Sequence, residues 1–223
     1  QEICDNTHSL YVDQWDWERV ITEKDRNLEY LKQTVQQIVH AIVETSSRLH
    51  TKYPQVDVMI DPEVHFISSQ ELENLYPNLT AKEREHAFVK KHPTTFIYQI
   101  GYPLKSGKPH DFRAPDYDDW LLNGDLLFWH EPLGIAMELS SMGIRVDSES
   151  LVKQLQHSGE EKRLNYEFHQ MVLSDTLPLT IGGGIGQSRI CMLLLGKAHI
   201  GEVQVSIWDE ETIKACEGKI NLL

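Results

Sequence analysis

A glycine-rich segment that ends in an arginine carries the strongest chemical signal in this sequence. It reads Gly-Gly-Gly-Ile-Gly-Gln-Ser-Arg over residues 182–189, and the apolar run Ile190–Leu195 follows directly. We expect a strand over Leu179–Ile181, a glycine turn and a buried helix, because glycine adopts positive φ and admits close ligands. A helix N-terminus with Arg189 on its first turn would bind a phosphate-like anion. The alternative is a tight turn whose glycines serve only packing.

Polar residues alternate with tryptophans near the N-terminus. Leu10–Trp17 is rich in aromatic and β-branched residues and predicts a strand. The alternation of a strand places Gln14, Asp16 and Glu18 on one face, opposite the two tryptophans. Such a face could hold an ammonium group or line a metal–nucleotide site. The alternative is an edge strand protected by charges.

A second acidic cluster follows a proline turn in the segment Arg113–Trp120. Asp116, Asp118 and Asp119 lie within four positions of one another. These carboxylates repel each other unless cations or an ammonium group lie among them. Taken alone, the segment is more simply interpreted as a solvated acidic loop.

Two further carboxylates fall near the ends of two expected strands. Asp125 precedes one strand and Glu138 lies in the next, an arrangement that suits Mg²⁺ together with phosphate. Arg145 lies in the same strand as Glu138, where a buried arginine needs a carboxylate partner, such as that of a substrate. The alternative is a structural ion pair, Glu138–Arg145 or another Asp–Arg pair.

The remaining pattern predicts an α+β fold. Apolar spacing predicts a long helix from Leu28 to Leu49 that Pro54 ends. Further helices are expected over Ser69–Leu75 and over 160–173. Two more should begin at N-terminal caps: one runs to Lys91 from a capping box of Thr80 with Glu83, and the other begins at Ser148. Further strands are expected at 64–67, 94–100, 126–129, 135–146 and 203–208. Because we expect hairpins to join most strands, the sheet should be mostly antiparallel, with helices on its faces. Gln14, Glu138 and Arg189 should open onto one common face.

Composition narrows the class of protein. The 223 residues carry a formal net charge of −13, which argues against general binding of nucleic acids or anionic membranes. The three cysteines have no metal-binding spacing and favour a reducing, cytoplasmic location. No apolar run is long enough to span a bilayer. We expect one catalytic domain over residues 1–223, incomplete at its N-terminus.

Several long motifs together resemble one enzyme family. They are His8–Glu18, Phe112–Trp120, Leu122–Asp125, Glu138–Asp147 and Ile181–Arg189. These segments resemble ammonia-dependent asparagine synthetase, also called aspartate–ammonia ligase, over about residues 8–207. The resemblance implies a fold like that of the class II aminoacyl-tRNA synthetases. It also implies the cofactors ATP and Mg²⁺ and the synthesis of L-asparagine from L-aspartate and ammonia through a β-aspartyl adenylate, with release of AMP and pyrophosphate.

The resemblance also assigns roles to residues. Asp118, Arg189 and Gln14 would be catalytic, and the aspartate pocket would contain Gln14, Asp16, Asp118, Ser141 and Arg145. The ATP site would contain Asp125, Glu138, Gly184, Gly186 and Arg189, with Mg²⁺ on Asp125 and Glu138. A homodimer of the full-length form is implied, and tRNA is not an expected partner.

The sequence departs from the family pattern in two places. Motif 1, a catalytic lysine and the motif 2 arginine are expected before Gln1, and the stretch between Trp120 and Leu121 is short. Two other functions remain open. One is a catalytic domain of an aspartyl- or asparaginyl-type tRNA synthetase, which would normally add a tRNA-binding domain and a basic face. The other is a non-catalytic paralogue that binds a nucleotide or an amino acid.

Overall fold

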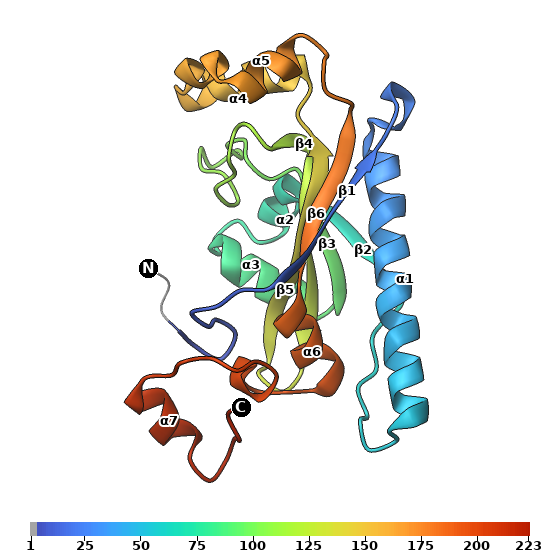
Figure 1. The fold of residues 1–223 in the computed structure, drawn as a ribbon, viewed down its shortest axis with the longest axis vertical. Coiled ribbons are helices and arrows are strands. Elements are labelled where there is room, and N and C mark those ends of the chain that lie inside the picture. Colours follow the sequence, from blue (N-terminus) through green and yellow to red (C-terminus); the bar gives the residue numbers. More distant parts are fainter. Residues whose placement is uncertain (1–3) are drawn as a thin grey trace.

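A computed structural model of the chain describes residues 4–223. Within them, six strands form one sheet in the order β1-β6-β5-β4-β3-β2 (Figure 1). The strands are β1 (Gln14–Val20), β2 (His65–Ser68), β3 (Thr94–Tyr98), β4 (Asp118–His130), β5 (Ile135–Arg145) and β6 (Thr180–Gly186). The helices are α1 (Leu28–Lys52), α2 (Ser69–Leu75), α3 (Ala81–Val89), α4 (Ser148–Ser158), α5 (Glu167–Leu173), α6 (Gln187–Leu195) and α7 (Glu210–Cys216). This is the expected α+β class.

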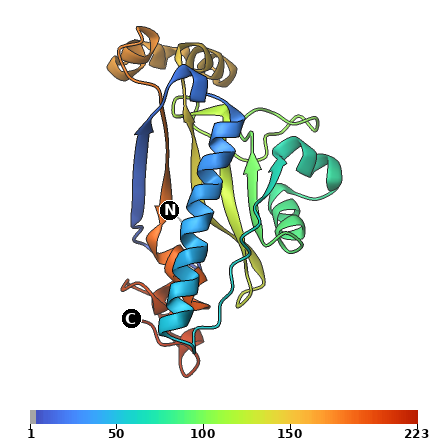
Figure 2. The same cartoon turned by 90° about the vertical axis from the view of Figure 1, so that its right-hand side faces the viewer.

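Helices cover both faces of the sheet. On one face α1 and α6 pack against the central strands, and Figure 2 shows α1 lying along the sheet. On the other face α2 and α3 cover β2, β3 and part of β4 around a second, smaller apolar cluster. A third cluster joins α4 and α5 at one end of the sheet (Figure 1). These layers leave part of the face opposite α1 open over β1, β6 and β5.

The long helix α1 follows the predicted apolar spacing. Leu31, Val35 and Val39 are buried on one side of it. Its N-terminus is capped by the Asn27 side chain, which accepts a hydrogen bond from the backbone N–H of Tyr30. The predicted capping box of α3, Thr80 with Glu83, is also confirmed.

The sheet is less regular than we expected. Neighbouring strands are antiparallel except β2 and β3, which are parallel. Only β4 and β5 form a tight hairpin among the described strands; a long loop without a helix joins β3 to β4, and helices interrupt the other three connections. The prediction that hairpins join most strands was therefore wrong, since a parallel neighbour and distant pairings require crossovers. The prediction that the first strand, the Glu138 strand and the glycine strand lie side by side is confirmed.

Two strand boundaries differ from the prediction for a physical reason. β1 begins at Gln14 because the chain before it is held by a side chain: the Gln204 amide donates to the Tyr11 carbonyl. β4 begins at Asp118, so Asp125 lies within this strand and not before it.

Two predictions in the C-terminal part of the chain were wrong. Residues 203–208 form no strand; Gln204 instead receives a hydrogen bond from Ser9, and Trp208 packs on His199. The helix expected over 160–173 is split at Tyr166, whose extended backbone separates a 3₁₀ turn from α5.

The glycine segment is a strand in the sheet and not the turn we predicted. Gly182, Gly183 and Gly184 pair with β1 on one side and β5 on the other, and β6 continues to Gly186. None of the glycines from 182 to 186 has a positive φ in the part of the chain described. Because these glycines lack side chains, side chains from the neighbouring strands can lie close to the backbone of β6. A Cβ on Gly184 would lie 2.8 Å from Oδ1 of Asp16 and 3.0 Å from Oε1 of Gln14.

Gly182 makes a similar close approach. A Cβ there would lie 2.5 Å from Nη2 of Arg145 and 2.6 Å from the Trp17 carbonyl oxygen, and would overlap the Glu18 carboxylate. Side chains of β1 therefore lie across a strand without side chains and reach groups on β5. Within residues 4–223, no helix combines the length and the apolarity that crossing a membrane requires.

We predict that Gly182→Ala lowers the free energy of unfolding by about 1–3 kcal/mol, the usual cost of overpacking. Urea unfolding would measure this loss. Gly186→Ala is the matched control, because its Cβ would meet its nearest neighbour at 3.7 Å, an ordinary contact. Equal stability of the two variants would contradict this explanation of the glycines.

The cap of α4 gives a second prediction. Asp147, and not the expected Ser148, caps this helix: its carboxylate accepts from the Ser150 backbone N–H at 2.8 Å and lies 3.0 Å from Nε of Arg26. Asp147→Ala should lower the free energy of unfolding by about 1–2 kcal/mol. Ser148→Ala should change it by less than about 0.5 kcal/mol. Thermal unfolding of both variants checks this ranking, which a larger loss in the Ser148 variant would reverse.

Candidate active site

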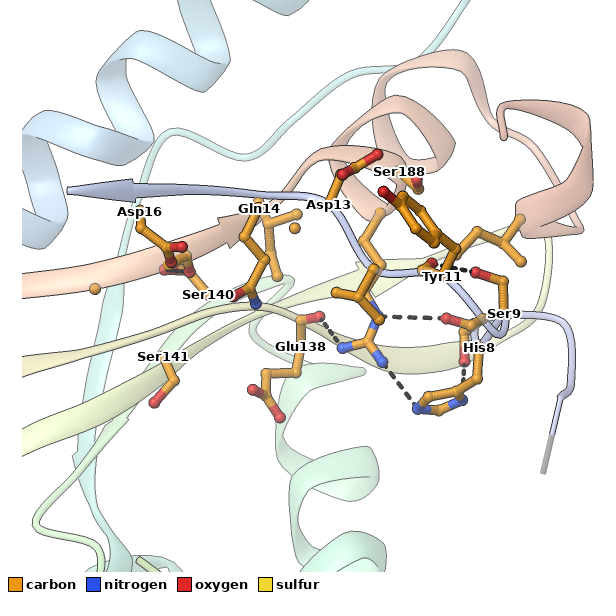
Figure 3. A pocket seen from close by; sticks show the side chains of 18 of the residues that line it. His8, Ser9, Tyr11, Asp13, Gln14, Asp16, Glu138, Ser140, Ser141 and Ser188 are labelled. Carbon is orange, nitrogen blue, oxygen red and sulfur yellow. Dashed lines mark hydrogen bonds between the residues drawn. The ribbon is translucent and has the colours of Figure 1, made fainter. Parts of the chain in front are cut away.

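A cavity lies over the glycine strand β6, on the face of the sheet opposite α1. Its volume is about 530 Å³, within the range of small-molecule sites (Figure 3). The N-terminal segment, the loop before β4, and strands β1, β5 and β6 contribute its walls. Gln14, Glu138 and Arg189 all line it, as the sequence predicted.

An irregularity in β5 brings its polar residues into this cavity. Met137 and Leu139 point into the core beneath α1, so Glu138 between them points the opposite way. The pairing of β5 with β4 shifts register here: Leu126 pairs with Ser140, whereas Leu127 pairs with Glu138. The extra residue is a β-bulge, which re-aims side chains. Ser140 and Ser141 therefore line the cavity together with Glu138 (Figure 3).

Arg189 is held in place at one end of the cavity. Its Nη1 donates to the Glu138 carbonyl at 2.9 Å, and Nη2 lies 2.9 Å from Nε2 of His8 (Figure 3). Because a guanidinium only donates, His8 Nε2 must be the acceptor, and His8 Nδ1 carries the hydrogen. That nitrogen lies 2.8 Å from Oδ1 of Asp5. The N-terminal segment thus fixes the orientation of Arg189.

Arg145 lies between two carboxylates at the other end. Its Nε and Nη2 donate to Glu18, at 2.7 Å for Nη2, and its Nη1 donates to Asp118. The Tyr117 ring stacks on the guanidinium, with 4.0 Å between Cζ and the ring centroid. Burial raises the pKa of Asp118 to about 6 even though Arg145 lies beside it. The Asp–Arg pair that the sequence left as an alternative is therefore present, although with Asp118 and Glu18 and not with Glu138.

Asp125 and Glu138 form an acidic pair on adjacent strands. Arg113 donates from Nη2 to Oδ2 of Asp125, while Oδ1 of Asp125 is buried and has no hydrogen-bond partner among residues 4–223. Repulsion from Asp125, together with burial, raises the pKa of Glu138 to about 7. No three His, Cys, Asp or Glu side chains within the described residues are grouped to hold a metal ion. The pair can offer a cation two carboxylates and an unused oxygen.

Most of the site residues predicted from sequence lie together. Those that line the cavity are Gln14, Asp16, Asp118, Glu138, Ser141, Gly184, Gly186 and Arg189. Asp125 and Arg145 are outside its immediate lining and contact it through Arg113 and Asp118.

Sequence reasoning gave no role to several residues that line the cavity. Arg113 and Tyr117 belong to the acidic segment before β4, and His8 and Ser140 accompany residues we had singled out. A cation directly before three carboxylates was a usable signal for Arg113. The contact of His8 with Arg189 joins residues 181 positions apart and left no local pattern.

Solved structures with a similar fold are class II synthetases. An aspartyl-tRNA synthetase from Entamoeba histolytica matches with a TM-score of 0.62 and 18% identity, over 95% of this chain and 46% of that one. An asparaginyl-tRNA synthetase from Pyrococcus horikoshii, complexed with asparaginyl-adenylate, matches with a TM-score of 0.62 and 17% identity. This match covers 90% of this chain and 48% of that one. Identities this low show the fold alone, and the predicted synthetase-like fold is confirmed.

Sequence comparison gives the family. The relative from Clostridium tetani is 59% identical, over 98% of this chain and 64% of its own length. The relative from Ligilactobacillus salivarius is 57% identical, over 97% of this chain and 65% of its own length. Both are named aspartate–ammonia ligase, and the chain spans about two thirds of their length. The family model described as aspartate–ammonia ligase matches residues 1–220. The chain therefore belongs to the aspartate–ammonia ligase family.

Proposed function

We propose that this chain is the catalytic domain of an enzyme that makes L-asparagine from L-aspartate, ammonia and ATP. The reaction would pass through a β-aspartyl adenylate and release AMP and pyrophosphate. One observation carries the proposal: a single cavity is lined by the fixed Arg189 and by Glu138 of the acidic pair at one end, and by Asp16 and Asp118 at the other, where Asp118 holds Arg145 just behind the lining. The first end suits a triphosphate, and the second suits an amino acid with charges of both signs.

Arg189 would bind the triphosphate. Its guanidinium is already oriented by His8 and by the Glu138 carbonyl, so little ordering remains when an anion binds. Gly184 and Gly186 would let the nucleotide lie close to the backbone of β6. Charge neutralisation and positioning would then accelerate attack of the substrate carboxylate on phosphorus without a protein nucleophile.

Asp125 and Glu138 would hold Mg²⁺. The buried, unpartnered Oδ1 of Asp125 and the raised pKa of Glu138 are what a site built for a cation shows without it. Mg²⁺ is commonly held by one or two carboxylates together with water and phosphate oxygens, which fits a pair of this size. When bound, the ion would neutralise charge on the phosphates.

Five residues would form the aspartate pocket, with Asp118 beside the four described next. Gln14 and Asp16 cross Gly184 from β1, and Ser141 lies beyond them on β5. Arg145 uses three of its five N–H groups on Glu18 and Asp118, which leaves two for the unreactive carboxylate of aspartate. The two carboxylates around one guanidinium leave a local negative charge, which favours the substrate amino group or an ammonium ion.

Asp118 would accept the proton that ammonium must lose to become a nucleophile. It lines the cavity, and its pKa of about 6 leaves it mostly ionised at neutral pH while keeping it a better base than an ordinary aspartate. Gln14 would align the reacting carboxylate with it.

Two other functions compete with this one. A tRNA synthetase shares the fold at 14–18% identity among the similar structures, whereas the ligases match at 56–59%, and the net charge of −13 disfavours tRNA. A non-catalytic paralogue would have no need to keep the acidic pair, Arg189 and Asp118 together. We further propose that residues 1–223 act as one domain, that the longer protein is a cytoplasmic homodimer, and that no tRNA takes part.

The products of the reaction test this function directly. The chain, alone and with any upstream sequence its gene encodes, should convert aspartate, Mg-ATP and ammonium chloride to asparagine and AMP in equal amounts. Chromatography of the amino acids and nucleotides would measure both. Production of ADP would refute the adenylate route, and esterification of tRNA with aspartate would favour the synthetase.

The role of Asp118 predicts a particular pH dependence. At a constant concentration of ammonium ion, the rate should fall below about pH 6, because the raised pKa means that the Asp118 carboxylate takes up a proton there and cannot accept one from ammonium. Asp118→Asn should be slower by about 10²–10⁴-fold, the usual contribution of a general base, and should lack this limb.

Glu18→Gln is the matched control for this measurement. It also loses a carboxylate that binds Arg145, but Glu18 does not line the cavity. This variant should therefore keep the limb near pH 6. A limb that persists in Asp118→Asn would remove Asp118 from the proton transfer.

A further inference from the structure

Arg113 occupies a position that the proposed chemistry of the site does not explain. It lies in the loop before β4, lines the cavity, and has a mostly buried side chain. Nη2 donates to Asp125, while Nη1 donates to the Phe112 carbonyl at 2.9 Å and lies 3.3 Å from the half-exposed carboxylate of Asp111. Its strongest partner is thus one of the two carboxylates proposed to hold a divalent cation.

Cationic side chains surround this pair of carboxylates without any bound ion. Glu138 faces the positive charges of Lys82, Arg189 and Arg113. Only Arg113 makes direct contact with Asp125, because Lys82 pairs with Glu85 at 2.9 Å and Arg189 bonds to the Glu138 carbonyl. Arg113 therefore supplies the counter-charge that makes the burial of Asp125 tolerable in the metal-free protein.

A divalent cation at Asp125 and Glu138 would conflict with this contact. The ion would place two positive charges beside a guanidinium on the same carboxylate, in a site with little water to screen them. Arg113 would then have to leave Asp125. The cavity that it lines offers the alternative partner, an anionic phosphate of the nucleotide, which a guanidinium binds as well as it binds a carboxylate.

We propose that Arg113 is an exchangeable counter-ion: it pairs with Asp125 in the free protein and moves to a substrate phosphate when the divalent cation enters. This proposal rests on the cation site described under the proposed function. It makes binding of the metal and of the phosphate mutually dependent. The phosphate draws Arg113 away from Asp125, which frees that carboxylate for the metal, and the metal releases Arg113 to bind the phosphate. Asp125 thereby stays neutralised in both states.

Binding of Mn²⁺ to the free protein, without nucleotide, tests the exchange. Arg113→Gln removes the competing cation, so the Mn²⁺ affinity measured by electron paramagnetic resonance should rise by about tenfold or more. Arg113→Lys keeps a competing charge and should stay close to the wild type. Lys82→Gln is the matched control, because it removes one nearby positive charge that does not touch Asp125, and should change the affinity by less than about threefold.

The outcomes separate this proposal from the cation site itself. The exchange would be overturned, and the cation site would stand, under two conditions. The wild type and Arg113→Gln would bind Mn²⁺ with equal affinity, and adding Asp125→Asn to either protein would abolish that binding. Mn²⁺ binding that Asp125→Asn does not weaken, or that is absent from all variants, would overturn both.

A crystal structure of the wild-type chain with Mn²⁺ needs no variant to fold. It should show the Arg113 guanidinium away from Asp125. Mn²⁺ on Asp125 with Arg113 still in contact would contradict the proposal.

Discussion

The close passage of β1 side chains over the glycines of β6 is the constraint on which the rest of the site depends. Gln14, Asp16 and Glu18 all lie on an edge strand, and β6 separates them from the carboxylates and serines of β5. Any Cβ on Gly182 or Gly184 would block their path. The missing side chains therefore turn three adjacent strands into one continuous binding surface. The β-bulge at Ser140 completes it by turning Glu138 and Ser141 to the same side.

Charge pairing is the second organising feature of this surface. Two arginines near the cavity are fixed by groups on other elements: Arg145 by Asp118 and Glu18, and Arg189 by His8 and the Glu138 carbonyl. Such pairing lets buried charges persist, at a desolvation cost that only good geometry offsets. Burial raises the pKa of Asp118, and repulsion from Asp125 together with burial raises that of Glu138, although the nearby cations oppose both shifts. These carboxyl groups are able to take a proton or a cation near neutral pH.

Local patterns in the sequence predicted the parts of the fold that depend on local physics. Apolar spacing predicted α1, and the Thr80–Glu83 capping box predicted the start of α3. The glycine segment was misread as a turn because glycine has low strand propensity, and only pairing on both sides makes it a strand. Most of the residues that we named as site candidates from their motifs line the cavity. The partners of Asp125 and Arg145 were not, because cross-strand and loop contacts leave no spacing signal in one sequence.

The central claim is that the surface over β6 is where the aspartyl adenylate forms. Titration calorimetry with a non-hydrolysable analogue of that adenylate, on the wild type and on Gly184→Ala, tests it most directly. An added Cβ would displace Gln14 and Asp16 from the path between β1 and β5. We expect Gly184→Ala to bind the analogue about tenfold more weakly or worse, because a loss of this size corresponds to one well-placed polar contact. Equal affinity in the two proteins would contradict the account.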